Sequence, residues 1–179
     1  MKRLFLTEHR CDVAPLHQAL LDHPELWDQY TSRTADPRSP HHGLSDIWAR
    51  YAPLEIAHLP GQHESVWYPV ADILPVRQLV EPLFEAVGGK RLGGVLITKI
   101  PAGAECKPHA DHGWHARFYE KFAVQVASSP GQAFRFDGES LETKPGDVFW
   151  FDNAYTHWVT NPTPFDRITL IACIRRQED

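Results

Sequence analysis

Short apolar runs with a period of two dominate the chain after Leu92, and this period is typical of β-strands. Turn formers such as Ser129-Pro-Gly131 and Lys144-Pro-Gly146 separate the runs. Six runs, rich in β-branched and aromatic residues, are expected to be strands: residues 92–100, 119–127, 133–138, 147–152, 157–160 and 167–175. Many short strands at regular spacing predict an antiparallel sandwich or barrel.

One clear helical pattern precedes these strands. Apolar residues recur at three- and four-residue spacing from Val76 to Val87, which predicts a helix that begins near Pro75 and ends before Gly88. Pro82 lies off this apolar stripe, and we expect it to kink the helix or to split it into two. The stripe is interpreted as core and not as a cofactor-binding surface.

Shorter elements are expected nearer the N-terminus. We predict a strand at residues 3–7 and a helix that is capped by Asp12 and ends before Pro24. Strands are also predicted at residues 44–51 and 65–70, because both stretches are apolar and aromatic.

The chain shows no internal repeat, low-complexity tract or linker, and its 179 residues suit one domain. We therefore expect a single domain over residues 1–179. Residues 1–91 would supply helices and N-terminal strands, and residues 92–179 would form the β core.

Composition narrows the classes of function. Hydrophobic residues at 42% and charged residues at 23% are ordinary for a globular protein. A net charge of −5 without a basic stripe argues against nucleic acid as a partner. Three cysteines without paired spacing argue against a disulfide framework. No apolar run approaches the roughly 18 residues of a membrane span, so we expect a cytoplasmic protein without membrane insertion. The oligomeric state cannot be predicted from this sequence.

Candidate chemistry centres on the triplet His109-Ala-Asp111. On an extended strand, His109 and Asp111 would project to the same side, as two ligands of one metal ion require. His157 is the best candidate for a third ligand, and two His with one carboxylate are the ligand set of non-heme Fe(II) oxygenases. One alternative is a simple hydrogen bond between His109 and its neighbour. Another is a metal set that His109 forms with His112 and His115.

Arg167 follows His157 by ten positions, at the start of a predicted strand. Iron oxygenases with open coordination positions use 2-oxoglutarate as a cosubstrate, and its distal carboxylate needs a fixed partner. Arg can supply one through two charge-assisted hydrogen bonds. Thr169 would point to the same side and add a hydroxyl group. The alternative is that Arg167 is an ordinary surface charge.

Three stretches together resemble a known superfamily. They are GGVLITKIPAGAECKPHAD (93–111), KPGDVFWFDNAYTHWVTN (144–161) and the strand that begins Arg167-Ile-Thr169. With the preceding helix, residues 66–175 resemble the Fe(II)- and 2-oxoglutarate-dependent dioxygenases. Within these, they are most similar to the aspartyl/asparaginyl β-hydroxylase-like branch.

This resemblance implies a mainly β fold, a double-stranded β-helix of the jelly-roll or cupin type with N-terminal helices packed outside. It implies that His109, Asp111 and His157 bind Fe(II) and form the catalytic centre. It also implies that Arg167 and Thr169 bind 2-oxoglutarate.

The implied reaction uses O2 and 2-oxoglutarate to hydroxylate an unactivated C–H, with release of succinate and CO2. In several relatives a residue on the strand after the first ligands contacts the second carboxylate of 2-oxoglutarate. Lys121 and Gln125 are the candidates for that role. Animal members of the branch have a small residue where this chain has Asp111, so the aspartyl substrate is not carried over with the fold.

The expected substrate is an amino acid, a peptide or a protein side chain. Residues 31–43 read as a polar loop, and Arg33 and His41 would either be solvated or meet the substrate there. Trp114, in the loop after Asp111, is a candidate wall of the substrate pocket. Two alternatives are a Zn- or Mn-dependent cupin-type enzyme and a non-catalytic cupin that binds a small molecule, and neither needs Arg167 as an anchor.

Overall fold

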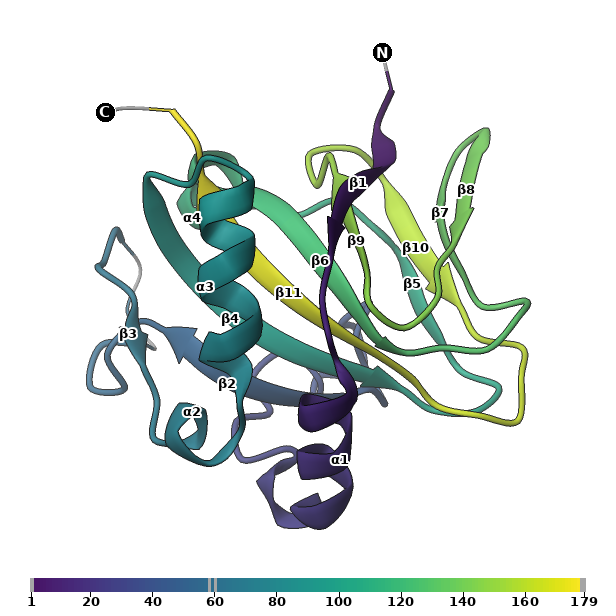
Figure 1. Cartoon of the computed structure of the whole chain (residues 1–179), viewed down its shortest axis with the longest axis horizontal. Helices are drawn as coiled ribbons and strands as arrows, with labels where there is room; N and C mark the ends of the chain where they lie inside the picture. The colour runs from purple at the N-terminus through teal and green to yellow at the C-terminus, as the bar shows by residue number, and fades with distance from the viewer. Residues whose placement is uncertain (1, 58, 60, 178–179) are drawn as a thin grey trace.

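The computed structural model describes residues 2–57, 59 and 61–177, and these form two antiparallel sheets that face each other (Figure 1). The larger sheet contains β1 (Leu4–Arg10), β2 (Ser45–Tyr51), β3 (Val66–Trp67), β4 (Arg91–Ile100), β6 (Glu120–Ala127), β9 (Asp147–Phe151) and β11 (Arg167–Arg175). The smaller contains β5 (Glu105–His109), β7 (Ala133–Phe136), β8 (Glu139–Glu142) and β10 (His157–Thr160). The strand orders are β1-β9-β6-β11-β4-β2-β3 and β5-β10-β7-β8.

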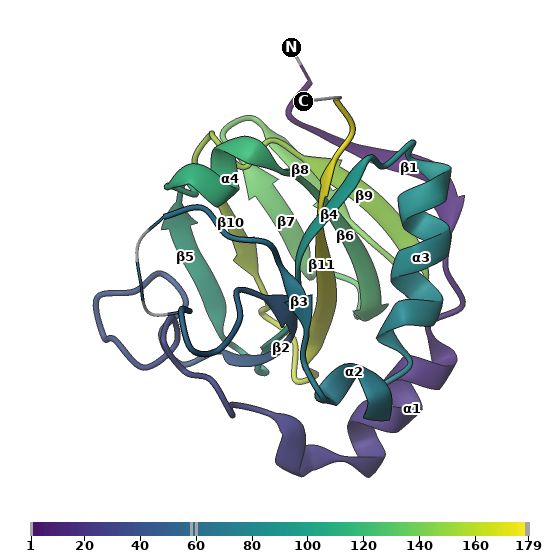
Figure 2. The same cartoon turned by 90° about the vertical axis from the view of Figure 1, so that its left-hand side faces the viewer.

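Helices α1 and α3 lie on one face of the larger sheet, and the smaller sheet and α4 lie on the other (Figures 1 and 2). The helical elements are α1 (Ala14–Asp22), a 3-10 turn (Pro24–Leu26), α2 (Val70–Ile73), α3 (Val76–Ala86) and α4 (Trp114–Phe118). This confirms a mainly β architecture of the double-stranded β-helix type with N-terminal helices outside it. The two sheets remain separate and do not close into one barrel.

Alternation along β11 divides the interior into two cores. Ile168, Leu170 and Ile174 are buried against the helices, in a core that includes Leu16 of α1 and Leu83 of α3. The intervening residues of β11 face the smaller sheet, where a second core of aromatic and aliphatic side chains surrounds a cavity: Ile100, Ala123, Phe134, Phe149, Phe151 and Val159. The functional site therefore lies between the sheets, away from α1 and α3.

Several predicted elements need correction. Residues 65–70 form a strand only at Val66–Trp67, and α2 begins at Val70. The helix α3 continues through Pro82, so it is not split into two there, and the proline is exposed as its place off the apolar stripe predicted. Two strands were not predicted, β5 and β8, because their sequences ECKPH and ESLE are polar. The short helix α4 was also not predicted.

Near the N-terminus, the predicted helix is present as α1, but its N-cap residue is not the predicted Asp12. Val13 occupies the cap position of α1, while the Asp12 carboxylate accepts a hydrogen bond from the Ala14 N–H (3.1 Å). The strand β1 extends to Arg10, beyond its predicted end at residue 7.

The single domain over residues 1–179 stays a prediction. Five of its residues, Met1, His58, Pro60, Glu178 and Asp179, lie outside the described part of the chain. Among the described helices, none combines the length and the apolar character that crossing a membrane would require.

Candidate active site

His109 and His157 face each other across a pair of strands in the smaller sheet. His109 ends β5, His157 begins β10, and the two residues are paired in register. The potential ligand atoms of His109, Asp111 and His157 all lie within 4.8 Å of one another, and His109 Nε2 is 3.6 Å from Asp111 Oδ1. The structure thus brings together the three residues that the sequence predicted as metal ligands.

The backbone around Asp111 differs from the extended strand that the sequence predicted. The strand β5 stops at His109, so Asp111 is not on the same extended strand. Its backbone N–H instead donates to the Asn153 carbonyl (2.9 Å), in the segment that leads into β10. The Asn153 side chain in turn donates to the Ala116 carbonyl of α4 (3.0 Å). These bonds hold the Asp111 loop beside His157.

Both imidazole rings are oriented by backbone carbonyls two residues earlier. His109 Nδ1 lies 2.7 Å from the Lys107 oxygen, and His157 Nδ1 lies 2.9 Å from the Tyr155 oxygen. If each Nδ1 carries the proton and donates it, each Nε2 keeps a free lone pair, which is the usual arrangement of metal-binding His. Burial lowers the pKa of His157, which favours the neutral ring that a metal ligand must have.

Arg167 is 1% exposed and faces the same cavity. Its Nη2 makes a long hydrogen bond to the Thr143 hydroxyl (3.4 Å), and its buried Nη1 has no partner among the described residues. Burial lowers the pKa of Arg167 to about 10, so the guanidinium is still charged at neutral pH. A buried cation without a carboxylate partner is costly, and an anionic ligand would satisfy it.

Thr169 lines the cavity two residues along β11, whereas Gln125 does not line it. The Gln125 amide is already satisfied, because it donates to the carbonyls of Ala127 (2.7 Å) and Ile168 (2.9 Å) and accepts from Thr143 (2.8 Å). Gln125 can therefore affect a ligand only indirectly, through Thr143, which bridges it to Arg167, and through Thr169, whose hydroxyl donates a long hydrogen bond to Gln125 Oε1 (3.5 Å).

Lys121 also lines the cavity, but at the opposite end from Arg167. It is paired in register with Cys173, which is six residues, or roughly 20 Å, along β11 from Arg167. Its ammonium donates to the Cys173 sulfur (3.0 Å) and forms no ion pair within the described part of the chain. Burial acts to lower the pKa of Lys121, but the Cys173 sulfur and the Asp111 carboxylate outweigh burial and raise it.

The cavity has a volume of about 240 Å³. Its walls are mainly apolar near Arg167 and become aromatic and more polar toward Lys121, where Trp48, Tyr51 and His115 contribute. A concave, mostly apolar pocket with a few convergent polar groups is the usual form of a small-molecule site.

The loop of residues 31–43 packs against the site instead of extending into solvent. Its Pro40 carbonyl accepts a hydrogen bond from Lys107 of β5 (2.9 Å), and the His41 ring contacts the His109 ring, with centroids 4.6 Å apart. Burial, followed by the charge of Arg33, lowers the pKa of His41 to about 2. Arg33 lines the cavity too, but its guanidinium is paired with the buried Asp46 (2.5 and 3.1 Å).

Trp114, like Gln125, is a predicted site residue that the cavity wall does not include. It packs in α4 against His63 and His115, with ring centroids 5.0 and 5.3 Å away. Neither His112 nor His115 joins a metal-ligand cluster among the described residues.

Two residues near the site were not singled out from the sequence, Thr143 and Cys106. Thr143 lies in the turn before β9, and nothing in the sequence connects it with Arg167. Cys106 lies on β5, three residues before His109, and a regular strand would place the two on opposite faces. A β-bulge changes this, because Cys106 and His109 are three residues apart while their partners on β10, Val159 and His157, are two apart.

Solved structures of two prolyl hydroxylases and of a 2OG-Fe(II) oxygenase family oxidoreductase share the architecture of this chain. A Pseudomonas putida prolyl-4-hydroxylase aligns over 98% of this chain and 93% of its own, with a TM-score of 0.54 and 15% identity. The viral collagen prolyl hydroxylase of Paramecium Bursaria Chlorella virus-1 aligns over 99% and 97%, with a TM-score of 0.56 and 10% identity. A 2OG-Fe(II) oxygenase family oxidoreductase from Burkholderia pseudomallei aligns over 76% and 70%, with a TM-score of 0.56 and 14% identity.

A comparison of the sequence with models of protein families identifies the family more specifically than the likeness of fold does. The profile of the family described as aspartyl/asparaginyl β-hydroxylase matches residues 73–177, more than half of the chain. The protein therefore belongs to the aspartyl/asparaginyl β-hydroxylase family and is an enzyme of the 2-oxoglutarate-dependent hydroxylase class. None of the curated proteins matches the chain significantly. The family and branch predicted from the sequence are thus confirmed.

Proposed function

We propose that the protein binds Fe(II) through His109, Asp111 and His157 and anchors 2-oxoglutarate on Arg167. The observation that carries this proposal is the charged Arg167, buried in the same cavity as the three potential ligands and without a partner for Nη1. The donor set supports iron, because two imidazoles and one carboxylate on one side leave positions for other ligands. A Zn or Mn cupin or a non-catalytic barrel has no use for this guanidinium.

When bound, iron with 2-oxoglutarate and O2 supplies the oxidising power to hydroxylate an unactivated C–H, with succinate and CO2 as coproducts. The residues of the chain supply position and environment. The Lys107 and Tyr155 carbonyls hold the two imidazoles, and Phe134 stacks on His157 with the rings 5.5 Å apart and nearly parallel. The apolar wall around Arg167 excludes water and strengthens its interaction with a carboxylate.

The substrate that we propose carries a carboxylate, which Lys121 binds. The backbones of Arg167 and Lys121 lie about 20 Å apart along the sheet, and 2-oxoglutarate, with five carbons, is no longer than about two residues of strand. Because the two side chains enter the cavity from opposite ends, we assign them to different carboxylates. Lys121 is near Asp111, on the side of the cavity that Tyr51 and His115 also line, so it is placed to bind the substrate. An acidic amino acid or an aspartyl side chain fits this chemistry.

The test of the iron and 2-oxoglutarate site is an anaerobic titration of metal-free protein with Fe(II) and then 2-oxoglutarate. We expect the weak visible charge-transfer band of the chelated keto acid in the wild type and its loss in Asp111→Ala. In Arg167→Lys the band should need about 10- to 100-fold more 2-oxoglutarate, because one or two charge-assisted hydrogen bonds are lost. A wild type without the band, or an unchanged requirement in Arg167→Lys, would refute the assignment.

The role of Lys121 is tested separately with Lys121→Met, which keeps the length of the side chain and removes its charge. Succinate release is measured with panels of free amino acids and of peptides that contain Asp, Asn or neutral residues. We expect the KM for an acidic substrate to rise at least tenfold, while the concentration of 2-oxoglutarate that half-saturates the charge-transfer band stays within twofold. The opposite pattern would assign Lys121 to the cosubstrate.

A further inference from the structure

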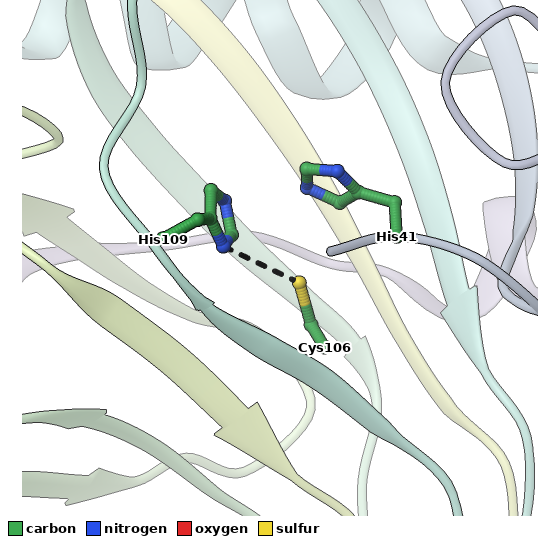
Figure 3. Close-up of side chains that lie close together, drawn as sticks. All are labelled: His41, Cys106 and His109. Carbon is green, nitrogen blue, oxygen red and sulfur yellow. Dashed lines mark hydrogen bonds between the residues drawn. The ribbon is translucent and has the colours of Figure 1, made fainter. Parts of the chain in front are cut away.

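A second group of metal-binding side chains lies beside the proposed iron site. His41, Cys106 and His109 each offer a ligand atom, and these atoms lie within 4.8 Å of one another (Figure 3). Cys106 Sγ is 3.9 Å from His109 Nδ1, and the His41 ring points toward the space between them. Two separate segments build this group, since Cys106 and His109 come from β5 and His41 comes from the loop before β2.

The local structure gives this cluster a fixed form. The β-bulge in β5 turns Cys106 and His109 toward the same side. The hydrogen bond from Lys107 to the Pro40 carbonyl (2.9 Å) fixes the loop beside that bulge, one residue before His41. Cys106 is only 6% exposed but lines the cavity, so a small cation can reach it through the cavity.

The two clusters differ in the metals that they favour. One sulfur and two imidazoles form a soft donor set, and thiolates select zinc, cobalt and similar cations. The set of His109, Asp111 and His157 has a hard carboxylate oxygen in place of the sulfur. Cys106 must lose its proton to bind a cation, and the balanced step is thiol plus M²⁺ giving metal thiolate plus H⁺.

We propose that His41, Cys106 and His109 form a second metal site that takes a thiophilic divalent cation, Zn(II) or Co(II), in competition with iron. The site itself stands on the cluster geometry, and the competition rests on the proposed iron site, with which it shares His109.

The two metal sites compete because both use the imidazole ring of His109, each through a different nitrogen. In the arrangement that suits iron, His109 Nδ1–H donates to the Lys107 carbonyl (2.7 Å), and Nε2 faces Asp111 (3.6 Å). The nitrogen nearest Cys106 is Nδ1, so a cation bound there displaces its proton and its bond to Lys107. His109 therefore serves one cluster or the other, and the cation in excess decides which.

The experiment is a Co(II) titration of the full-length, metal-free protein, followed by the sulfur-to-cobalt charge-transfer absorption. We expect this absorption in the wild type and in Asp111→Ala, which keeps all three soft-site ligands. It should be absent in Cys106→Ser and Cys106→Ala, and its half-saturation should need at least tenfold more Co(II) in His41→Ala. Cys11→Ser is the matched control, because Cys11 is a half-buried thiol outside the cavity and its loss should leave the absorption intact.

A wild type without thiolate absorption would overturn the site, as would absorption that survives in both Cys106 variants while their circular dichroism is native. Competition is measured by loading Fe(II) and 2-oxoglutarate before Co(II) or Zn(II). We expect Zn(II) to remove the keto-acid band of the wild type and to need at least tenfold more metal to do so in Cys106→Ser. Coexistence of the iron and cobalt bands would overturn the competition. Failure of the iron proposal alone would remove the keto-acid band and leave the cobalt absorption.

Discussion

The imidazole rings of His109 and His157 are oriented in the same way, each by the backbone carbonyl of the residue two positions earlier. Both carbonyls belong to short, irregular backbone, at the bulge before His109 and the turn before His157. Backbone groups cannot be removed by a side-chain substitution, so the ring orientation withstands changes in the neighbouring sequence.

His115 is a neutral histidine whose state has a consequence for stability. The Gly94 N–H donates to His115 Nε2 (3.2 Å), and this bond requires Nε2 without a proton. Burial, followed by the charge of Lys121, lowers the pKa of His115 to about 3. In the unfolded chain the ring takes up a proton near pH 6.5, whereas the folded protein resists it. The contribution of neutral His115 to the unfolding free energy is therefore fully present above pH 6.5, and it is lost as the pH falls from 6.5 toward 3.

We predict that His115→Gln weakens this loss, since the Gln carbonyl can still accept from Gly94 but does not titrate. The unfolding free energy of the wild type should fall by up to about 1 kcal/mol per pH unit more steeply than that of the variant between pH 6 and 4. Urea unfolding at several pH values measures the slopes. Parallel slopes would show that another group controls the acid sensitivity.

At the scale of elements, the segment of residues 31–43 is fastened to the larger sheet by one ion pair. Arg33 pairs with Asp46 of β2 and also donates to the Thr98 hydroxyl of β4 (2.7 Å). Asp46 is fully buried, while the Arg33 side chain is 24% exposed. This pair sets the position of His41 over His109, because both Arg33 and His41 belong to the same short loop.

Asp46→Ala should destabilise the protein by about 3 kcal/mol, because it leaves the partly buried Arg33 without a counter-charge. Urea unfolding gives the cost, and limited proteolysis should show earlier cleavage within residues 31–43. The double variant Asp46→Ala with Arg33→Met is the control. It should recover part of the stability, and a double variant as unstable as Asp46→Ala would contradict the charge argument.

The elements also show which parts of the structure the sequence could predict. The buried strands β4, β6, β9, β10 and β11 lie within a residue of their predicted bounds, because alternating burial leaves a period of two in the sequence. The strands β5 and β8 have polar sequences and depend on their partners, so no local pattern revealed them. Asp111 illustrates the same limit at the site, because its place beside His157 depends on Asn153, forty-two positions away in the sequence.

The sequence could predict the residues of the candidate site that belong to a recognisable motif, but not the others. The spacing of His109, Asp111, His157 and Arg167 predicted one site, and the structure brings the four residues to one cavity, although Asp111 does not lie on the strand expected for it. Thr143 and Cys106 were missed because only strand register and a bulge bring them to the site. Trp114 was expected in the pocket wall, but the turn of α4 directs it toward His63 instead.

For the whole molecule, the two cores predict a separation between stability and ligand binding. Leu170 is fully buried among the helices, while Thr169 beside it faces the cavity. Leu170→Ala should cost about 2–5 kcal/mol of unfolding free energy and leave the affinity for 2-oxoglutarate unchanged. Thr169→Ala should cost less than about 1 kcal/mol and weaken 2-oxoglutarate binding severalfold.

Urea unfolding and the anaerobic titration on the same two proteins check both halves of this prediction. Equal losses of stability in the two variants would mean that the cavity side of β11 is as important for folding as the helix side.

The alternation along β11 also has an evolutionary consequence. Point substitutions at residues 171 and 173 can reshape the pocket without affecting the helix-facing core, so a duplicated gene can acquire a new substrate in small steps. Inserting or deleting a residue within β11 would have a much larger effect. It would rotate every later side chain to the other face, placing apolar residues in the cavity and polar ones beneath the helices. In a lineage of such proteins, changes in length should therefore accumulate in the connecting loops while β11 keeps nine residues.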